Sequence, residues 1–293
     1  MSNQSSSVPV QSAYDGSGLY FQLLRACGWG ALLNLGYSQP WDWFLYPFRA
    51  DIAQERLVQR SINLLQVQPQ QQVLDVACGK GKSSFLLAMQ HPQASVIGLD
   101  MVPMHIELAE AQYGYTRNLQ YQVGQAEALP CPDQSVERIH CLEAAFHFDR
   151  QRFLQEVKRV LKPGGRVVIV DFMWKNAASR HLLETTEGKL MRQLWQFDDC
   201  WSVQEYQDAA AQLGFHQAAL LDLSKPVSNM SHKRMQNLVK ASLKPAQLKQ
   251  FCQLHPALHY FSAADWAVLR QYSDAHKPFC EVSCYMALVL EKR

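Results

Sequence analysis

The sequence lacks a dominant charge of either sign, a long apolar run and closely spaced cysteine pairs. Its 28 Lys and Arg residues against 26 Asp and Glu residues give a net charge of +2, which provides no general attraction to nucleic acid. The most apolar stretch, 19–35, is interrupted by Gln22 and Arg25 and is too short to span a membrane. Residues 1–16 are polar and show no signal-peptide pattern. These absences predict a protein with no membrane span and no nucleic-acid partner.

The eight cysteines include no C-x-x-C pair, which is the spacing typical of metal sites and redox motifs. Cys280 and Cys284 lie in a segment with an alternating strand pattern, so we expect both to face one side of a strand rather than to bind metal. Free thiols in this number are typical of a reducing compartment. We therefore predict no metal centre and a cytoplasmic location.

The most informative segment that is present is 73–84, VLDVACGKGKSS. It predicts a buried strand that ends in Asp75, a tight glycine turn and a helix that begins near Ser83. Two common nucleotide motifs are excluded here. A P-loop would need a glycine where Val76 stands, and a dinucleotide-binding motif would need a third glycine soon after Gly81.

The remaining pattern is an acid followed by a small residue and two glycines, and it suits a ligand that carries an ammonium group and a ribose. A second predicted strand, SVIGLD, ends in Asp100, at the position where folds of this kind hold a ribose. The alternative for this segment alone is a tight turn that binds no ligand.

Three further segments follow the loop in order, namely VIGLDM, VGQAEALPCPDQSVERIHC and LKPGGRVVIVDF. The ordered set resembles the class I S-adenosylmethionine-dependent methyltransferases, particularly the branch that methylates small molecules such as quinones, tocopherols, sterols, sugars and prenyl diphosphates. The resemblance covers roughly residues 50–223 and the last strand. It implies S-adenosylmethionine as the cofactor, S-adenosylhomocysteine as the product and a small-molecule substrate.

The resemblance also implies which residues bind the cofactor. Asp75 would lie near its methionine end, Asp100 on the ribose hydroxyls and Met101 against the adenine. The full set of candidates is Asp75, Ala77, Gly79, Gly81, Asp100, Met101, Gln125, Ala126 and Glu127.

The chain departs from the family pattern at two of these positions. Ala77 replaces the first glycine of the loop, which is tolerable if φ stays below zero there. Gln125 replaces an acid, but its side-chain carbonyl can accept the same hydrogen bond from the adenine amino group. We expect Lys80 and Lys82 to point to solvent, because a cationic sulfonium gains nothing from nearby lysines.

Alternating strands and helices predict an α/β fold with a doubly wound, mainly parallel sheet, and the resemblance implies an antiparallel last strand. We expect helices at 50–65, at 153–161 and at 203–213, and strands near 218–223 and 281–291. Residues 1–50 are predicted to form a cap, and 51–293 the cofactor-binding domain. Helical lid insertions are expected at about 174–201 and 225–278.

Candidate catalytic residues follow the fourth and fifth predicted strands, whose carboxyl ends face the ligand in open sheets of this kind. They are Glu143, His147 and Asp171, and in related enzymes the matching positions face the acceptor. Methyl transfer needs a base only where the acceptor loses a proton. The structural alternatives are a helix-start histidine bonded to a backbone carbonyl and a glutamate that supports the cofactor.

Aromatic residues in the cap and the first insertion are the candidate substrate contacts, because an aromatic-rich lid suits a flat or greasy substrate. They are Trp41, Trp43, Tyr46, Trp174, Trp195 and Trp201. Packing within the cap is the alternative. The second insertion has six Lys and Arg residues and no acid between Asp222 and Asp265. It could hold an anionic group such as a diphosphate, or it could be a solvated helix face.

The first hypothesis is O-methylation of a small, largely apolar or aromatic metabolite, with His147 as the base. The second is C-methylation of an isoprenoid diphosphate through a carbocation, with Glu143 as the base. A cofactor-binding protein without catalysis is the alternative from another class. A nucleic-acid methyltransferase is disfavoured, because the signature used on flipped bases is absent.

Overall fold

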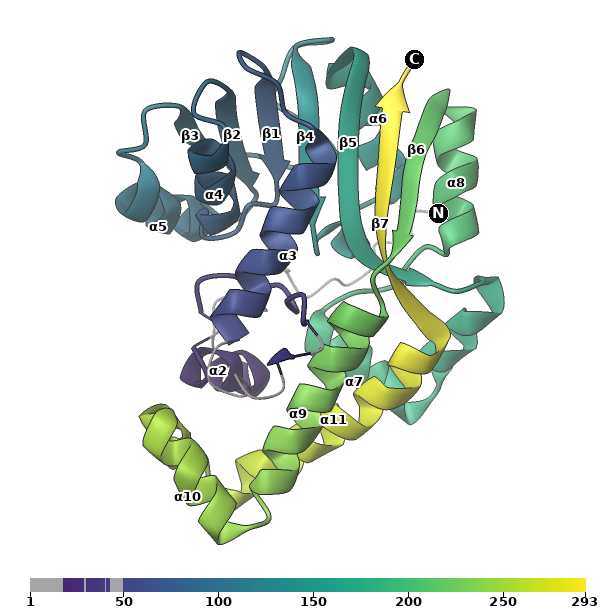
Figure 1. The fold of residues 1–293 in the computed structure, drawn as a ribbon. Helices are drawn as coiled ribbons and strands as arrows, with labels where there is room; N and C mark the ends of the chain where they lie inside the picture. Colours follow the sequence, from purple (N-terminus) through teal and green to yellow (C-terminus); the bar gives the residue numbers. More distant parts are fainter. Residues whose placement is uncertain (1–17, 29, 40, 43–49) are drawn as a thin grey trace.

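A seven-stranded sheet forms the centre of the molecule (Figure 1). The computed structural model describes residues 18–28, 30–39, 41–42 and 50–293. The strand order is β3-β2-β1-β4-β5-β7-β6. The strands are β1 (Gln72–Val76), β2 (Ser95–Asp100), β3 (Leu119–Val123), β4 (Val136–Leu142), β5 (Leu161–Trp174), β6 (Phe215–Asp222) and β7 (Ser283–Lys292). Strands β1 to β5 are parallel and β7 is antiparallel to both neighbours, which confirms the predicted sheet.

Strands β5 and β7 lie in the buried core of the sheet. In β5 every residue from Val167 to Trp174 is buried, and in β7 every residue from Ser283 to Leu290 is buried. A strand covered on both faces needs an apolar sequence throughout, which explains the run VVIVDF. The one acid in that run, Asp171, therefore needs partners inside the protein.

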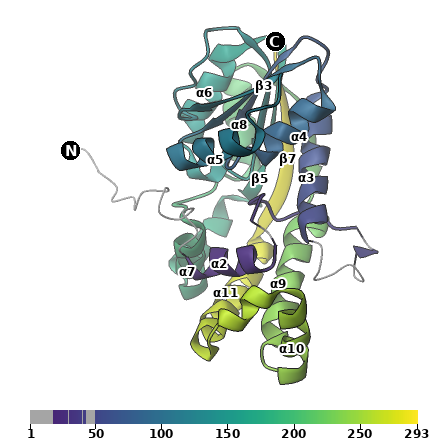
Figure 2. The same ribbon diagram turned by 90° about the vertical axis from the view of Figure 1, so that its left-hand side faces the viewer.

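Helices cover both faces of the sheet (Figure 2). α3 (Ala50–Leu65) and α4 (Lys82–Gln90) lie on one face, and α6 (Arg150–Val160) and α8 (Val203–Gln212) lie on the other. α5 (Pro103–Tyr113) joins β2 to β3. The helices predicted at 50–65, in the 153–161 crossover and at 203–213 are all present.

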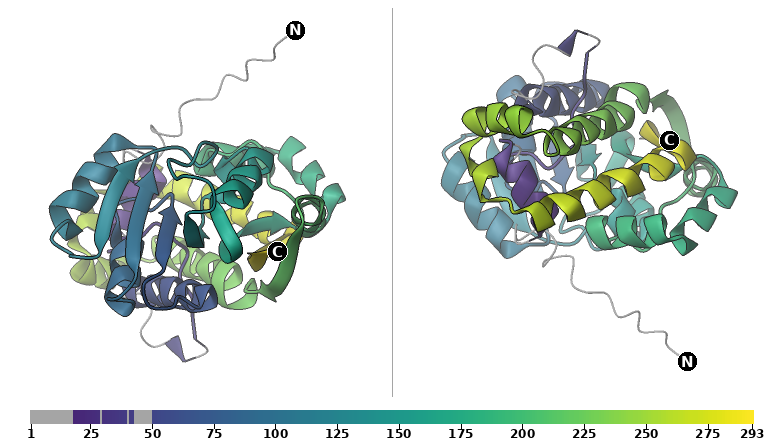
Figure 3. Two further views of the ribbon diagram at one scale, coloured as in Figure 1. Left: turned by 90° about the horizontal axis from the view of Figure 1, so that it is seen from above. Right: turned by 90° about the horizontal axis from the view of Figure 1, so that it is seen from below.

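Both stretches between the repeating units are mainly helical and lie beyond the carboxyl ends of the parallel strands (Figures 1 and 3). The first contains η3 (Ala177–Glu184) and α7 (Thr186–Trp195). The second contains η4 (Lys225–Asn229), α9 (Met230–Ala241), α10 (Pro245–Leu254), η5 (Pro256–Tyr260) and α11 (Ala263–Val282).

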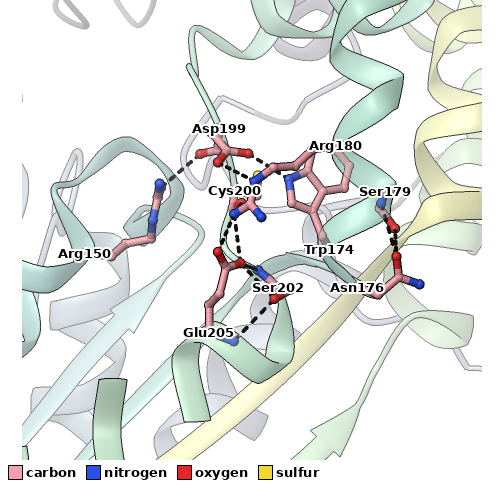
Figure 4. Close-up of polar contacts among 9 residues, drawn as sticks. All are labelled: Arg150, Trp174, Asn176, Ser179, Arg180, Asp199, Cys200, Ser202 and Glu205. Atoms are coloured by element: carbon pink, nitrogen blue, oxygen red, sulfur yellow. Dashed lines mark hydrogen bonds and ion pairs between the residues drawn. The ribbon is translucent and has the colours of Figure 1, made fainter. Parts of the chain in front are cut away.

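One arginine ties the first stretch to the core (Figure 4). The Arg180 guanidinium donates to the Asp199 carboxylate at 2.7 Å and to both carboxylate oxygens of Glu205 at 2.8 Å. Asp199 also accepts from Trp174 Nε1 at 2.8 Å, and its backbone carbonyl accepts from Arg150 at 2.9 Å. This network joins β5, η3, α6 and α8, so it ties both ends of the stretch that contains α7 to the core.

The N-terminal part of the structure covers the same end of the sheet. α2 (Leu19–Ala26) is followed by residues 30–37, here called the cap strap. Gln54 of α3 is 3% exposed and donates to the carbonyls of Leu32 and Asn34 at 2.7 and 2.8 Å, so the cap strap is anchored on α3. Within the described residues, none of the helices has the length and apolar character needed to cross a bilayer.

The prediction for the two C-terminal cysteines was wrong. α11 continues to Val282 although Pro278 lies inside it, so Cys280 is helical and only Cys284 lies in β7. Buried positions at Trp266 and Leu269 recur at helical spacing and continue as far as residue 279, and their burial against the lid outweighs the alternating pattern.

Candidate active site

A cavity of about 350 Å3 lies at the carboxyl ends of β1, β2 and β4, beneath α2 and the cap strap. Its size is that of a typical small-molecule site, and its wall is mostly apolar with a few convergent polar groups. One end is formed by the glycine loop after β1 and by the residues after β2. The other end is formed by the turn after β4, by α2 and by the last residue of α7.

The carboxylate of Asp75 is fixed by groups from three elements. Ser83 and Ser84 at the start of α4 donate to Oδ2 at 2.7 and 2.6 Å, and His140 Nδ1 lies 2.7 Å from Oδ1. The Nε2 atom of His140 lies 2.8 Å from Ser61 Oγ. This Ser-His-Asp arrangement resembles a hydrolase triad, but all three side chains are at most 2% exposed and only Asp75 lines the cavity. We infer that His140 and Ser61, which the sequence did not single out, hold Asp75 in place.

Asp100 shapes the glycine loop from the neighbouring strand. Its Oδ2 accepts from the Gly79 N–H at 2.8 Å, and its Oδ1 accepts from the Val102 N–H at 2.9 Å and lies 3.3 Å from His105 Nδ1. A carboxylate offers about four acceptor positions, so Asp100 retains capacity for one further donor. A Cβ atom at Gly79 would meet nothing within 4 Å, which shows that the loop backbone borders open space.

Two small residues of the loop differ from expectation. Ala77 has φ +58°, so the condition of a negative φ is not met, and the residue adopts the left-handed conformation that the family glycine would adopt without strain. Gly81 does not line the cavity. A Cβ there would lie 2.5 Å from Ala109 and 2.6 Å from the Tyr121 hydroxyl, so this glycine allows α4 to approach the sheet.

The remaining cofactor candidates line one wall of the cavity together. Met101, Gln125, Ala126 and Glu127 all border it, and Met101 is 42% exposed. Glu127 also accepts from the Asp149 backbone N–H at 2.9 Å, so it anchors the start of α6. Their contacts with a cofactor remain predictions.

Glu143 lies at the acceptor end with its backbone at φ +51°. Its Oε1 accepts from the Leu35 backbone N–H at 2.8 Å and from the Tyr285 hydroxyl at 2.6 Å. Burial raises the pKa of this carboxyl to about 8, and the two donors offset only part of that effect. Through these two hydrogen bonds the side chain joins the cap strap to β7. With a pKa of about 8, the carboxyl is mainly protonated at neutral pH.

His147 ends the short helix η2 (Ala145–His147) and also lines the cavity. Burial lowers the pKa of its imidazole to about 4, so the ring is neutral at pH 7. Nδ1 lies 3.1 Å from the Gln196 carbonyl, which can only accept, so the proton sits on Nδ1 and the lone pair on Nε2. The hydrogen bond to a backbone carbonyl that was the structural alternative for this histidine is therefore present. This hydrogen bond determines which ring nitrogen carries the proton.

Asp171 does not line the cavity and is fully buried. Its Oδ2 accepts from the Phe146 backbone N–H at 2.9 Å and its Oδ1 from the Phe172 N–H at 2.7 Å. Burial raises the pKa of this carboxyl to about 7. Asp171 therefore holds the turn before His147 and does not border the cavity, so its predicted catalytic role stays a prediction that this placement does not favour.

The sequence of this chain is similar to those of known proteins. Residues 73–165 match the methyltransferase domain family. An O-methyltransferase of Aspergillus nomiae, rstn1, is 33% identical over 178 residues, which cover 58% of this chain and 74% of that protein. The chain belongs to the class I S-adenosylmethionine-dependent methyltransferases. A second O-methyltransferase, resE of Aspergillus sclerotiorum, is 29% identical over 64% of this chain and 72% of its own length.

Solved structures show the same fold for the methyltransferase. A geranyl diphosphate methyltransferase determined with geranyl diphosphate and sinefungin superimposes with a TM-score of 0.67 and 15% identity, over 92% of this chain and 94% of that one. Among the curated relatives, some are spanned over much less of their length, such as an O-methyltransferase of Pyrenophora dematioidea at 47%. The acceptor therefore does not follow from the relatives.

The methyltransferase uses S-adenosylmethionine, and its described residues fit that cofactor. Glycine backbone borders the cavity at the loop, and the two strand-end carboxylates, Asp75 and Asp100, lie beside it. No group of three or more His, Cys, Asp or Glu side chains within the described residues is placed to hold a metal ion.

The tryptophans predicted to contact substrate are spread over different environments. Trp195 lines the cavity. Trp174 is fully buried and bonded to Asp199, Trp201 packs edge-on against Tyr206, and Trp41 is 56% exposed; none of these three borders the cavity. Trp43 and Tyr46 lie outside the described residues. The network around Arg180 explains the placement of Trp174, because its Nε1 donates to Asp199 within that network (Figure 4).

Both loop lysines make protein contacts, so the expectation that they point to solvent was wrong. Lys80 lines the cavity, and its Nζ donates to the Gly30 carbonyl at 3.2 Å. Lys82 pairs with Glu55 of α3 at 2.5 Å. The cap strap and α3 lie over the loop, and sequence spacing alone could not place them there.

Part of the acceptor wall was not predicted. Phe21 and Leu24 of α2, residues 31–35 of the cap strap and Phe146 all line the cavity. The apolar stretch 19–35 was the available signal, since its polar interruptions suit an amphipathic segment packed over a pocket. His105, which also lines the cavity, gave no signal.

Proposed function

We propose that this methyltransferase transfers a methyl group to a hydroxyl oxygen of a small, largely apolar and uncharged metabolite. The observation that carries the proposal is the composition of the cavity wall. Its acceptor end is formed by apolar side chains such as Phe21, Leu24, Phe146 and Trp195, with Glu143 and His147 as the titratable groups. A greasy acceptor would bury its surface there and present one polar group to these two side chains.

The charges of the wall argue against an anionic acceptor. Among the described residues that line the cavity, four are acids and Lys80 is the single Lys or Arg. None of the six cations of the 225–249 segment borders it. A diphosphate carries several negative charges and would need more cationic partners than one lysine provides. C-methylation of an isoprenoid diphosphate is therefore the weaker alternative.

The two titratable groups suit different tasks because their environments move their pKa values in opposite directions. His147 is neutral above about pH 4 and keeps its lone pair on Nε2, so it can accept the hydroxyl proton. Glu143 is protonated below about pH 8 and can donate a hydrogen bond to the acceptor oxygen before transfer. The cofactor supplies a methyl group on a cationic sulfur, and the dry apolar wall excludes water from the reacting atoms.

We infer that Lys80 binds the carboxylate of the cofactor. Its ammonium group reaches the cavity from the glycine loop and donates to the Gly30 carbonyl. Burial and the nearby Arg25 lower the pKa of this lysine, so a neighbouring carboxylate would stabilise its charged form. A carboxylate at this end would supply that counter-ion.

Three broader points are proposed with this function. The free state of all eight cysteines supports a reducing compartment such as the cytoplasm. Small-molecule O-methylation suits a biosynthetic role. We divide the chain into a cap at 1–50 and a catalytic domain at 51–293, with the two helical lid insertions described above.

Two substitutions test the assignment of the base. His147→Ala should abolish turnover with a hydroxyl acceptor while leaving S-adenosylhomocysteine affinity within about twofold, because the base does not hold the cofactor. Glu143→Gln keeps the donor and should retain most of the activity. The matched control is His181→Ala, an exposed histidine bonded only to its own turn. Loss of turnover in Glu143→Gln with normal activity in His147→Ala would favour the carbocation route instead.

A further inference from the structure

The charge of this protein is unevenly distributed along the chain. Residues 223–264, here called the basic arm, contain six Lys and Arg residues and no Asp or Glu, a net charge of +6. The other residues contain 22 Lys and Arg against 26 Asp and Glu, a net charge of −4. Five of the six cations are exposed lysines, namely Lys225, Lys233, Lys240, Lys244 and Lys249. The arm therefore forms a cationic end on an otherwise acidic molecule.

Large apolar side chains are exposed in the same arm. Leu243 is 62% exposed, Leu254 is 52% exposed and Tyr260 is 90% exposed. The first two flank α10, and Tyr260 ends η5. Leu243 directly precedes Lys244, so apolar and cationic groups alternate at the turn between α9 and α10. Exposed apolar groups of this size cost free energy in water unless something covers them.

The arm lies at the end of the molecule that is remote from the amino ends of the parallel strands. Seen from that end, α9 and α10 run along one side and α11 along the other, with α2 between them (Figure 3). Helix α2 packs against η5 and α11. Because Phe21 and Leu24 of α2 line the cavity, the arm packs behind one wall of the cavity.

We propose that the basic arm docks the protein on an anionic phospholipid surface. Lysines near such a surface gain from its negative potential, and Leu and Tyr side chains insert at the headgroup boundary. Docking would bring the α2 wall close to the lipid, from which an apolar acceptor could pass to the cavity. The docking itself requires no methyl transfer, so it goes beyond the proposed function and can fail independently of it.

The exposed apolar residues favour a lipid surface over the other anionic partners. Nucleic acid would be bound by the lysines alone, with a strong dependence on salt. An acidic protein would match the lysines but would leave Tyr260, at 90% exposure, without a defined pocket. A bilayer is the surface that accepts both kinds of group without a specific shape.

Vesicle co-sedimentation of the full chain tests the proposal. We expect binding to vesicles of phosphatidylcholine with about one-third phosphatidylglycerol, and at least about tenfold weaker binding to phosphatidylcholine alone. The triple variant K240E, K244E and K249E should bind the anionic vesicles about 100-fold more weakly. The control R117E, R152E and K158E makes the same charge change at exposed positions outside the arm and should bind as the wild type does.

A second variant separates lipid insertion from simple charge attraction. L243S with Y260S keeps every lysine, and it should weaken binding several-fold at about 1 M salt, where the charge term is screened. S-adenosylhomocysteine binding by calorimetry confirms that each variant is folded. The proposal is overturned if anionic vesicles are not bound, if the control triple loses as much binding as the arm triple, or if a DNA duplex or a polyglutamate peptide is bound more tightly than the vesicles.

Discussion

Glu143 is the residue at which the cap strap, the sheet and the cavity meet. Its carboxyl accepts from Leu35 of the strap and from Tyr285 of β7, and it borders the cavity. Its left-handed backbone aims the side chain inward from the end of β4. The protonation state of one carboxyl is thus linked to the contact between the cap strap and the sheet.

That linkage predicts a pH effect on stability. The pKa of Glu143 is about 8 in the folded chain and near 4.3 when unfolded, so the unfolded state holds fewer protons between these values. The contribution of Glu143 to stability is therefore present at acid pH and falls as the pH rises from about 4 to about 8. Glu143→Gln cannot ionise, so we expect it to lose less stability between pH 5 and pH 8 than the wild type, by on the order of 2–4 kcal/mol. Urea unfolding at the two pH values measures the difference, and equal losses would refute the assigned pKa.

Lys80 predicts a selective effect on the cofactor. Lys80→Met should weaken S-adenosylhomocysteine about tenfold, because one charge-assisted contact is lost. It should leave 5′-methylthioadenosine, which has no carboxylate, bound as before. Lys82→Met, which removes a lysine paired with Glu55 on α3, is the matched control and should bind both ligands normally. Calorimetry that shows equal losses for the two ligands would exclude a contact with the carboxylate.

We expect the substitution Ala77→Gly to stabilise the folded protein. A residue at φ +58° that carries a Cβ is strained, so Ala77→Gly should raise the free energy of unfolding by about 1 kcal/mol. The comparison is Ala88→Gly inside α4, where glycine should lower the free energy of unfolding by at least about 1 kcal/mol. Urea unfolding of both variants checks the signs, and a loss of stability in both would mean that Ala77 is not strained.

At the scale of the element, the first insertion depends on the Arg180 network. Arg180→Gln removes the contacts to Asp199 and Glu205, and we expect it to lower the free energy of unfolding by about 1–2 kcal/mol. Arg192→Gln breaks a more exposed 3.4 Å pair with Asp198 in the same stretch and should cost less than about 0.5 kcal/mol. Chemical denaturation of the two variants side by side gives the test, and equal effects would show that the network contributes no more than one exposed ion pair.

The elements that the sequence predicted are those with strong local signals. The apolar run of β5 and the helical spacing of apolar residues in α6 depend on neighbours within a few residues, so the sequence pattern alone placed them. The positive φ of Ala77 and the contact of Lys80 with Gly30 depend on segments that the fold brings together from far apart in the chain. For the same reason, the tryptophans could be identified as aromatic lid residues, but only the structure separated Trp195 at the cavity from Trp174 in the packing.

At the scale of the whole molecule, an apolar cavity lies between the sheet and a lid formed by α2, the cap strap and the end of α7, and the basic arm packs behind α2. The cofactor end was predictable because its residues follow consecutive strands whose carboxyl ends share one edge of the sheet. The acceptor end was not, because it is built from insertions whose positions are set by long-range packing. The charge is also divided, because the arm carries six cations and no acid, whereas the described cavity wall carries four acids and one lysine.

The most direct test is the position of a labelled methyl group. The protein is incubated with S-adenosylmethionine that carries a trideuterated methyl group and with matched apolar phenols, alcohols and prenyl diphosphates, and the products are analysed by mass spectrometry. We predict that the label is found on an oxygen of an uncharged acceptor. We also predict that His147→Ala forms no such product while it still binds S-adenosylhomocysteine. Label on a carbon atom of a prenyl diphosphate, with no O-methylated product from any uncharged acceptor, would contradict the first of these predictions.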